Sequence, residues 1–132
     1  MRVYIASKYV EHQNINREIF NSLQKENISA FLPKSINVDA ITLEEMFFVA
    51  EICYDEIEKC DIIVIVTPFG KSVSSEVGYA IALKRRDHNK KLVLYNYQHV
   101  DLSLKTEAMI MPYFDAAVDN IPDLIKCINS YC

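Results

Sequence analysis

Apolar residues along this chain fall alternately into short continuous runs and into longer stretches with helical spacing. Residues 3–6 form the first run, residues 12–26 the first helical stripe, and residues 28–32 a second run that stops at Pro33. A short apolar run predicts a buried strand, whereas spacings of three and four predict an amphipathic helix. The first part of the chain therefore predicts a strand, a helix and a second strand.

The next stretch predicts a long helix. Residues 34–41 are expected to form a loop, after which Thr42 and Glu45 have the spacing of a capping box. The predicted helix extends to about Cys60. One of its sides carries an apolar stripe, which consists of Leu43, Met46, Phe47, Ala50, Cys53, Tyr54 and Ile57.

The most hydrophobic run of the chain begins after Asp61 and covers residues 62–66. Its continuous β-branched side chains are typical of a central parallel strand that is covered on both faces. A loop over 67–73 and a helix over 74–86 are expected next, and the basic end of this helix complements its dipole. The remaining predicted elements are a strand over 92–95, a short helix or irregular segment over 101–111, a fifth strand over 113–118 and a closing helix over 122–131.

Strands that alternate with helices predict an α/β fold with a parallel sheet between two helical layers. Right-handed crossovers favour a three-layer, doubly wound sandwich of five strands in the flavodoxin-like order 2-1-3-4-5, formed as one domain over residues 1–132. In such sheets a ligand binds beyond the carboxyl ends of the strands, between strands 1 and 3. This rule selects two loops, residues 7–9 and residues 67–76.

Composition and charge argue against several classes of function. The net charge of −4 does not favour binding to nucleic acid or to an anionic membrane. No apolar stretch approaches the ~18 residues of a membrane span, and the apolar start is too short for a signal peptide, so a cytoplasmic protein is expected. The cysteines Cys53, Cys60, Cys127 and Cys132 form no CxxC pair, which predicts free thiols and no metal site.

The loop over 67–76 carries the most informative candidate chemistry. It ends at a predicted helix N-terminus, with Ser74 as the expected cap and Glu76 in the first turn. Glu76 either only complements the helix dipole or is a catalytic carboxylate that the helix N-terminus keeps ionised. The acidic residues of a response-regulator receiver, the glycine-rich loop of a flavodoxin and a P-loop are missing from the corresponding positions.

Three stretches resemble the nucleoside 2-deoxyribosyltransferase family. Residues 4–9, YIASKY, are similar to its YLA-x-P-F opening, and residues 57–66, IEKCDIIVIV, to its I-x-x-A-D strand entry. Residues 75–80, SEVGYA, are similar to its A-x-E-I-G-Y-A helix start. The spacing from Thr67 to Glu76 is also similar to that of the related 2′-deoxynucleoside 5′-phosphate N-hydrolases.

The resemblance implies roles for particular residues. Glu76 corresponds to the catalytic nucleophile and Tyr9 to the aromatic residue that lines the base pocket, with Tyr4 a second candidate beside it. The other substrate-binding candidates lie on the two loops selected above and are Ser7, Lys8, Thr67, Phe69, Gly70, Lys71 and Ser72. The family further implies a small nucleoside or nucleotide as the partner, a homo-oligomer, and neither a cofactor nor a metal.

Two positions depart from the family pattern. Cys53 stands where the family has an aspartate that assists protonation of the leaving base, and Gly70 where it often has Asp or Ser. Asp55, close by in sequence, is the candidate to replace that aspartate. Two functions therefore stay open. One is an enzyme that cleaves or transfers the N-glycosidic bond of a 2′-deoxynucleoside or its 5′-monophosphate, and the other is a non-catalytic nucleotide-binding module.

Overall fold

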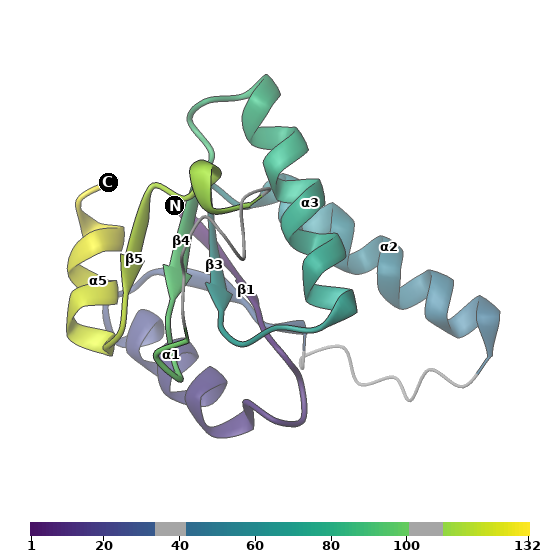
Figure 1. Cartoon of the computed structure of the whole chain (residues 1–132), viewed down its shortest axis with the longest axis horizontal. Coiled ribbons are helices and arrows are strands. Elements are labelled where there is room, and N and C mark those ends of the chain that lie inside the picture. Colours follow the sequence, from purple (N-terminus) through teal and green to yellow (C-terminus); the bar gives the residue numbers. More distant parts are fainter. Residues whose placement is uncertain (34–41, 101–109) are drawn as a thin grey trace.

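The computed structural model describes residues 1–33, 42–100 and 110–132. Within these residues it contains a five-stranded sheet whose neighbouring strands are all parallel, in the order β2-β1-β3-β4-β5 (Figure 1). The strands are β1 (Arg2–Ala6), β2 (Ser29–Phe31), β3 (Ile62–Val66), β4 (Lys91–Tyr95) and β5 (Ala116–Val118). The predicted strand order and the central place of residues 62–66 are confirmed.

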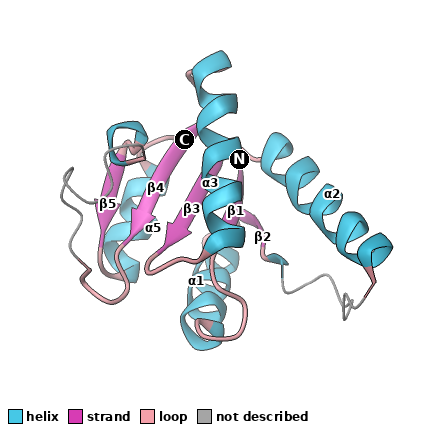
Figure 2. Ribbon diagram, turned by 45° about the vertical axis from the view of Figure 1, so that its right-hand side comes forward, coloured by secondary structure: helices cyan, strands magenta, loops and turns pink. Residues whose placement is uncertain are grey.

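Helices cover both faces of the sheet, which gives the predicted three layers (Figure 2). The described helices are α1 (Gln13–Lys25), α2 (Leu43–Lys59), α3 (Lys71–Arg86), α5 (Ile121–Asn129) and a short 3-10 helix, η2 (Met111–Tyr113). α1 and α5 pack on one face, and α2 and α3 pack on the other. No helix of the described segments combines the length and the apolar content that crossing a membrane requires.

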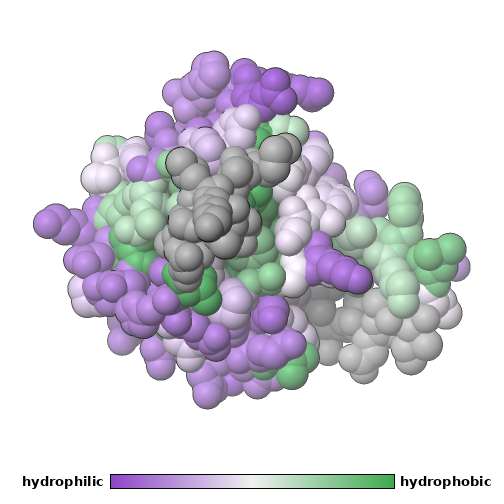
Figure 3. All heavy atoms as spheres, viewed as in Figure 1, coloured by the Kyte–Doolittle hydropathy of each residue, from purple (hydrophilic) through white to green (hydrophobic). Residues whose placement is uncertain are grey.

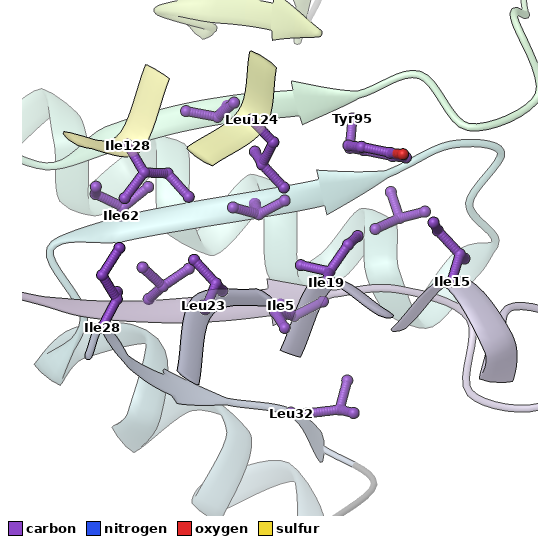
Figure 4. Packing of buried hydrophobic residues seen from close by; sticks show 14 residues of the cluster. Ile5, Ile15, Ile19, Leu23, Ile28, Leu32, Ile62, Tyr95, Leu124 and Ile128 are labelled. Carbon is purple, nitrogen blue, oxygen red and sulfur yellow. The ribbon is translucent and has the colours of Figure 1, made fainter. Parts of the chain in front are cut away.

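The middle strand, β3, has an apolar run because both of its faces are covered. Ile62 and the alternate residues after it point toward α1 and α5, where they meet Leu124 and Ile128 (Figure 4). Ile63 and Ile65 point to the opposite core, under α2 and α3. All five side chains of the strand are buried. The continuous pattern therefore reflects two cores rather than one.

The predicted cap of α2 is confirmed, whereas the predicted start of α3 is wrong. Thr42 Oγ1 accepts a hydrogen bond from the Glu45 amide at 3.1 Å. α3 begins before the predicted position, with Gly70 as its N-cap, and the Ser74 hydroxyl donates to the Gly70 carbonyl at 2.8 Å. A serine that bonds the carbonyl four residues back belongs to the helix interior rather than to its cap. Glu76 consequently lies in the second turn of α3 and not in the first.

The C-terminal part differs from the prediction in one strand. η2 ends where the fifth strand was expected to begin, and β5 forms only over the last part of the predicted range. The amides of Tyr113 and Phe114 donate to the carbonyls of Ile110 (3.0 Å) and Met111 (3.3 Å) in η2 and are not available to a sheet ladder, which explains the late start. The loop predicted over 34–41 and almost all of the segment 101–111 lie outside the described residues.

α2 buries much less of its apolar side than the pattern suggests. Ile57 is the one buried side chain of this helix, while Leu43, Phe47 and Phe48 are 83%, 66% and 55% exposed. Figure 1 shows that the first half of α2 extends away from the sheet, and Figure 3 shows hydrophobic residues, in green, at its outer end. The apolar stripe is therefore only partly a core stripe.

The C-terminal end of α2 is fixed to the sheet by a buried lysine. Lys90, directly before β4, is 7% exposed, and its ammonium donates to three carbonyl oxygens. These carbonyls belong to Ile57 (3.0 Å), Glu58 (3.2 Å) and Cys60. Carbonyls at a helix C-terminus lack helical partners and favour a positive charge. Lys90 supplies both the hydrogen bonds and the charge.

We expect Lys90→Met to lower the free energy of unfolding by about 2–3 kcal/mol, because the charged donor is lost while the carbonyls stay buried. The midpoint of urea unfolding measures this change. Lys59→Met is the matched control, since Lys59 is exposed and pairs only with Glu56 among the described residues. The control should lose less than about 1 kcal/mol. Equal losses in the two variants would contradict a special role for the buried ammonium.

Candidate active site

A pocket of about 590 Å³ opens beyond the carboxyl ends of β1 and β3. Its walls come from the β1–α1 loop, from Pro33 two residues after β2, from one side of α2 and from the first turns of α3. The lining residues are Ser7, Lys8, Tyr9, Glu11, Pro33, Met46, Val49, Ala50, Cys53, Tyr54, Gly70, Lys71, Ser72, Val73, Ser75 and Glu76. The pocket lies at the reversal of strand order, which is where doubly wound sheets bind their ligands.

Two buried polar residues of α1 and its N-cap hold the β1–α1 loop. Ser7 Oγ lies 3.2 Å from His12 Nδ1, and the Asn16 amide donates to the Lys8 carbonyl at 3.1 Å. His12 and Asn16 are both about 2% exposed. Burial and the nearby Lys8 lower the pKa of His12, so the imidazole is neutral at pH 7. These contacts fix the loop that carries four lining residues, Ser7, Lys8, Tyr9 and Glu11.

The N-terminus of α3 forms the polar wall of the pocket. No acidic residue lies in its first turn, and no described side chain caps the Gly70 end, so the first amides face the pocket free of side-chain acceptors. Lys8 Cε lies 3.7 Å from the point where a Cβ of residue 70 would be, so this side chain extends across the helix start. With Lys71 and Ser72 beside them, these amides make a region that favours an anion.

Glu76 is the carboxyl group at the inner end of this pocket. Burial raises the pKa of Glu76 to about 7, and the nearby Tyr4 hydroxyl opposes the rise. Its Oε2 is buried without a hydrogen bond of ordinary geometry to any described residue. The expectation that the helix N-terminus keeps Glu76 fully ionised is therefore wrong. The carboxyl lies one turn further along the helix than predicted, and burial outweighs the dipole there.

Tyr4 and Cys53 share the buried surroundings of Glu76. Tyr4 is fully buried on β1, and its hydroxyl oxygen has no hydrogen-bond partner of ordinary geometry among the described residues. Burial, together with the charge of Glu76, raises the pKa of Tyr4. Burial also raises the pKa of the Cys53 thiol, with Tyr4 opposing and Glu76 adding to the rise. Both groups therefore stay protonated at neutral pH.

The wall opposite α3 is apolar and comes from one face of α2. Met46, Val49, Ala50, Cys53 and Tyr54 follow one another at spacings of three, one, three and one, which places them on a single helical face. All of these residues except Val49 belong to the predicted apolar stripe. This face packs only partly on the core and otherwise lines the pocket.

The structure brings most of the candidate residues from the sequence together, but not all. Ser7, Lys8, Tyr9, Gly70, Lys71, Ser72 and Glu76 line the pocket, and Tyr4 lies beside Glu76. Thr67 and Phe69 are not in the lining: the Thr67 hydroxyl donates to Asn96 Oδ1 at 2.8 Å, and Phe69 packs on the core under α3. Asp55 is exposed on α2 and is also outside the lining.

Sequence reasoning missed two groups of residues in and around the site. His12 and Asn16 support the β1–α1 loop, and the only signal for them was a polar pair at the start of a helix. Val49 was not assigned to the apolar stripe of α2, although its spacing from Met46 fits that face. Periodicity indicates which residues share a helical face, but not whether that face meets a core or a cavity.

A second hollow of about 580 Å³ lies between β5 and α5, with Asn96, Asp119, Asp123 and Lys126 among its lining residues. It lies at the edge of the sheet, away from the strand-order reversal. The described residues contain no group of three or more His, Cys, Asp or Glu side chains that could hold a metal ion. The pocket beside Glu76 is therefore the better candidate for catalysis, since it combines a buried carboxyl with an anion-binding helix start.

No protein-family model and no curated protein matches this sequence. Solved structures do match. A 2-deoxyribosyltransferase from Bacillus psychrosaccharolyticus is 18% identical with a TM-score of 0.74, over 94% of this chain and 90% of that chain. CMP N-glycosidase from Clostridium botulinum is 13% identical with a TM-score of 0.62, over 100% of both chains. A conserved protein from Enterococcus faecalis V583 is 15% identical with a TM-score of 0.73, over 100% of this chain and 99% of that one.

These similarities concern the fold, because the sequence identities are low. The chain has the five-stranded α/β fold of the 2-deoxyribosyltransferase and of the N-glycosidase. The resemblance that the sequence motifs indicated is confirmed at this level.

Proposed function

We propose that this chain cleaves or transfers the N-glycosidic bond of a 2′-deoxynucleoside or of its 5′-monophosphate, with Glu76 as the carboxylate nucleophile. The observation that carries the proposal is the buried Glu76 carboxyl at the inner end of a pocket between an anion-binding helix start and an apolar wall. Two proteins of the same fold are named for N-glycosidic chemistry, one as a 2-deoxyribosyltransferase and one as a CMP N-glycosidase. We place the enzyme in the cytoplasm, where its four free thiols stay reduced.

The chemistry requires that positive charge at C1′ be stabilised. As the C1′–N bond breaks, its electron pair leaves with the base and the sugar gains oxocarbenium character. The ionised Glu76 carboxylate attacks C1′ and forms a sugar ester. Water then releases the free sugar, or the nitrogen of a second base takes the sugar and completes a transfer. The Tyr4 hydroxyl, beside Glu76, favours the ionised carboxylate and so acts as a positioning group.

A non-catalytic nucleotide-binding module is the second candidate. Cys53 favours it, because this lining residue replaces the family's acid with a neutral thiol. Gly70 favours it too, since it brings no side chain to the helix start.

Release of free base distinguishes the two functions. The protein is incubated with each deoxynucleoside and each deoxynucleoside 5′-monophosphate, and the free base is separated by chromatography. We expect base release that Glu76→Ala abolishes while its circular dichroism spectrum stays unchanged. Tight binding without base release would favour the module.

We expect the 5′-monophosphate to be preferred over the nucleoside, because Lys8, Lys71 and the free amides of α3 lie at one end of the pocket. Lys71→Met should lower kcat/KM for the monophosphate by about five- to tenfold, in line with the loss of one charged hydrogen bond. It should leave kcat/KM for the nucleoside nearly unchanged. Lys25→Met, at the far end of α1, is the matched control. A wild type that shows no preference for the monophosphate would leave the lysines without this role.

We further propose that the enzyme is a homo-oligomer in which the outer half of α2 is covered by a second copy. Met46 belongs both to this exposed apolar surface and to the pocket lining, so a second copy placed there also closes the pocket. We expect Phe47→Asp with Phe48→Asp to convert the oligomer to a monomer in light scattering after gel filtration. Val10→Asp, a change at an exposed apolar residue outside α2, is the control. A monomeric wild type would contradict this proposal.

A further inference from the structure

The described lining of the pocket includes the proposed nucleophile but no evident acid for the leaving base. Among the described lining residues, the carboxyl groups are those of Glu76 and Glu11. Glu11 is exposed on the β1–α1 loop, on the side of the pocket that also carries Lys8. The apolar face of α2 faces the space that remains for a base, and it brings no carboxyl and no imidazole. A neutral base that leaves toward this wall has no described group to protonate it.

The hydroxyl and thiol groups near Glu76 are also poor acids for the leaving base. The Cys53 side chain is half-buried and the Tyr4 side chain is buried, and both groups hold their protons more tightly than usual, with raised pKa values. Tyr54 also lines the pocket, and its ring packs edge-to-face on Tyr79 with 4.9 Å between the ring centres. An apolar wall also stabilises an anionic base poorly.

Resting on the function proposed above, we propose that the preferred substrate is a nucleotide whose glycosidic nitrogen belongs to a positively charged ring, of the N-glycosyl pyridinium or N7-alkylated purine class. Such a base leaves as a neutral molecule and needs no proton. The apolar wall of α2 then suits the product, and the aromatic ring of Tyr54 suits the cation before the bond breaks.

Hydrolysis of such a nucleotide releases a different number of protons than hydrolysis of a nucleotide with a neutral base. The C1′–N bond breaks, and its electron pair neutralises the charged ring. Glu76 forms a bond to C1′, and water later displaces the Glu76 carboxylate from C1′. The sugar thereby gains a hydroxyl group, and one proton is released to solution. Hydrolysis of a neutral base releases no net proton, because the base takes one up. The two classes are therefore distinguishable by proton release as well as by product.

The charges of the pocket match the two ends of such a nucleotide. Lys8, Lys71 and the free amides of α3 lie where the phosphate is expected. The Glu76 carboxylate lines the same pocket as these groups and the α2 face, and a buried charge attracts an opposite charge more strongly than it does in water. A cationic ring thus gains affinity from the same group that attacks the sugar.

The first test compares turnover of matched substrates at pH 8. Nicotinamide mononucleotide is compared with cytidine 5′-monophosphate, once in the ribo and once in the 2′-deoxy series. We expect kcat/KM to favour the charged member of each pair by at least about 100-fold, the lower end of what acid catalysis supplies to a neutral base. One proton should be released per charged base. Equal or better turnover of the neutral members overturns the inference but supports the proposed function.

The second test uses binding, because charged N-glycosides are also intrinsically more reactive. Calorimetry at pH 8 compares the carbocyclic analogue of nicotinamide mononucleotide, which the enzyme cannot hydrolyse, with its uncharged dihydro form. We expect the wild type to prefer the charged form, and Glu76→Gln to reduce that preference by about tenfold. A preference that Glu76→Gln leaves unchanged overturns the inference. Absence of base release from every substrate overturns the proposed function as well.

Discussion

Glu76→Gln is expected to lower base release by at least about 10³-fold and, at pH 8, to raise the free energy of unfolding by about 2–3 kcal/mol. Base release falls because an amide oxygen is a much weaker nucleophile than a carboxylate and forms no stable sugar ester. The free energy of unfolding rises because the wild-type protein must keep a buried carboxylate charged at pH 8. Among the described residues, its Oε2 has no hydrogen bond of ordinary geometry. The two effects together are the signature of an active-site group held against its own stability.

The stability gain depends on pH in a definite direction. The pKa of Glu76 is raised from 4.5 to about 7 in the folded chain. Between these values the unfolded chain loses its proton first, so the wild type loses stability as pH rises from about 4.5 to about 7 and loses no more above that range. Glutamine does not titrate. The advantage of Glu76→Gln should therefore be absent near pH 4, grow through pH 6 and be complete by pH 8.

Denaturant unfolding at pH 4, 6 and 8 measures this dependence of stability on pH. The kcat/KM of the wild type should rise over the same pH range, because the nucleophile ionises there. Glu51→Gln, at an exposed position on α2, is the matched control and should change stability by less than about 0.5 kcal/mol at every pH. A gain for Glu76→Gln that is equal at pH 4 and pH 8 would contradict burial as its cause. Unchanged turnover would exclude Glu76 as the nucleophile.

The layered fold was predictable because the strands are recognisable from their own apolar, β-branched residues. The run Ile62–Val66 is apolar at every position, which only a strand covered on both faces requires, and its β-branched residues disfavour a helix. The start of α3 was not predictable in the same way. Ser72, Ser74 and Ser75 all suit an N-cap, and the choice among them depends on where the chain leaves β3. In the structure Gly70 takes the cap, and Ser74 and Ser75 bond carbonyls behind them.

The location of the site was also predictable, but its electrostatics were not. The strand-order rule selects the β1–α1 loop and the start of α3, and both line the pocket. The pKa of Glu76, however, depends on how deeply the side chain is buried and on Tyr4, a neighbour far away in sequence. Tyr4 reaches it because β1 pairs with β3, which places Tyr4 beside Ile63 on the face covered by α3. Such contacts depend on register and side-chain packing, which periodicity does not encode.

Cys53 is the position where the sequence and the structure point to the same functional consequence. The thiol lines the pocket, and burial keeps it neutral, so it neither donates a proton readily nor carries a charge. Base exchange needs a proton transfer twice, once to the leaving base and once in reverse from the incoming base, whereas hydrolysis needs it once. We therefore expect the wild type to hydrolyse ordinary deoxynucleotides slowly and to exchange their bases more slowly still.

Cys53→Asp is expected to raise base exchange between a deoxynucleoside and a second free base by about 10²-fold or more, within the range of general acid–base catalysis. The half-buried site and the nearby Glu76 charge should raise the pKa of the new carboxyl, which keeps a proton available near neutral pH. Cys53→Asn is the matched control, because it has nearly the same shape but no acidic proton. Chromatography of the swapped nucleoside measures the rates, and thermal unfolding checks that each variant is folded. Rapid exchange by the wild type, or no gain from a folded Cys53→Asp, would mean that Cys53 only packs against the core and that the proton comes from another group.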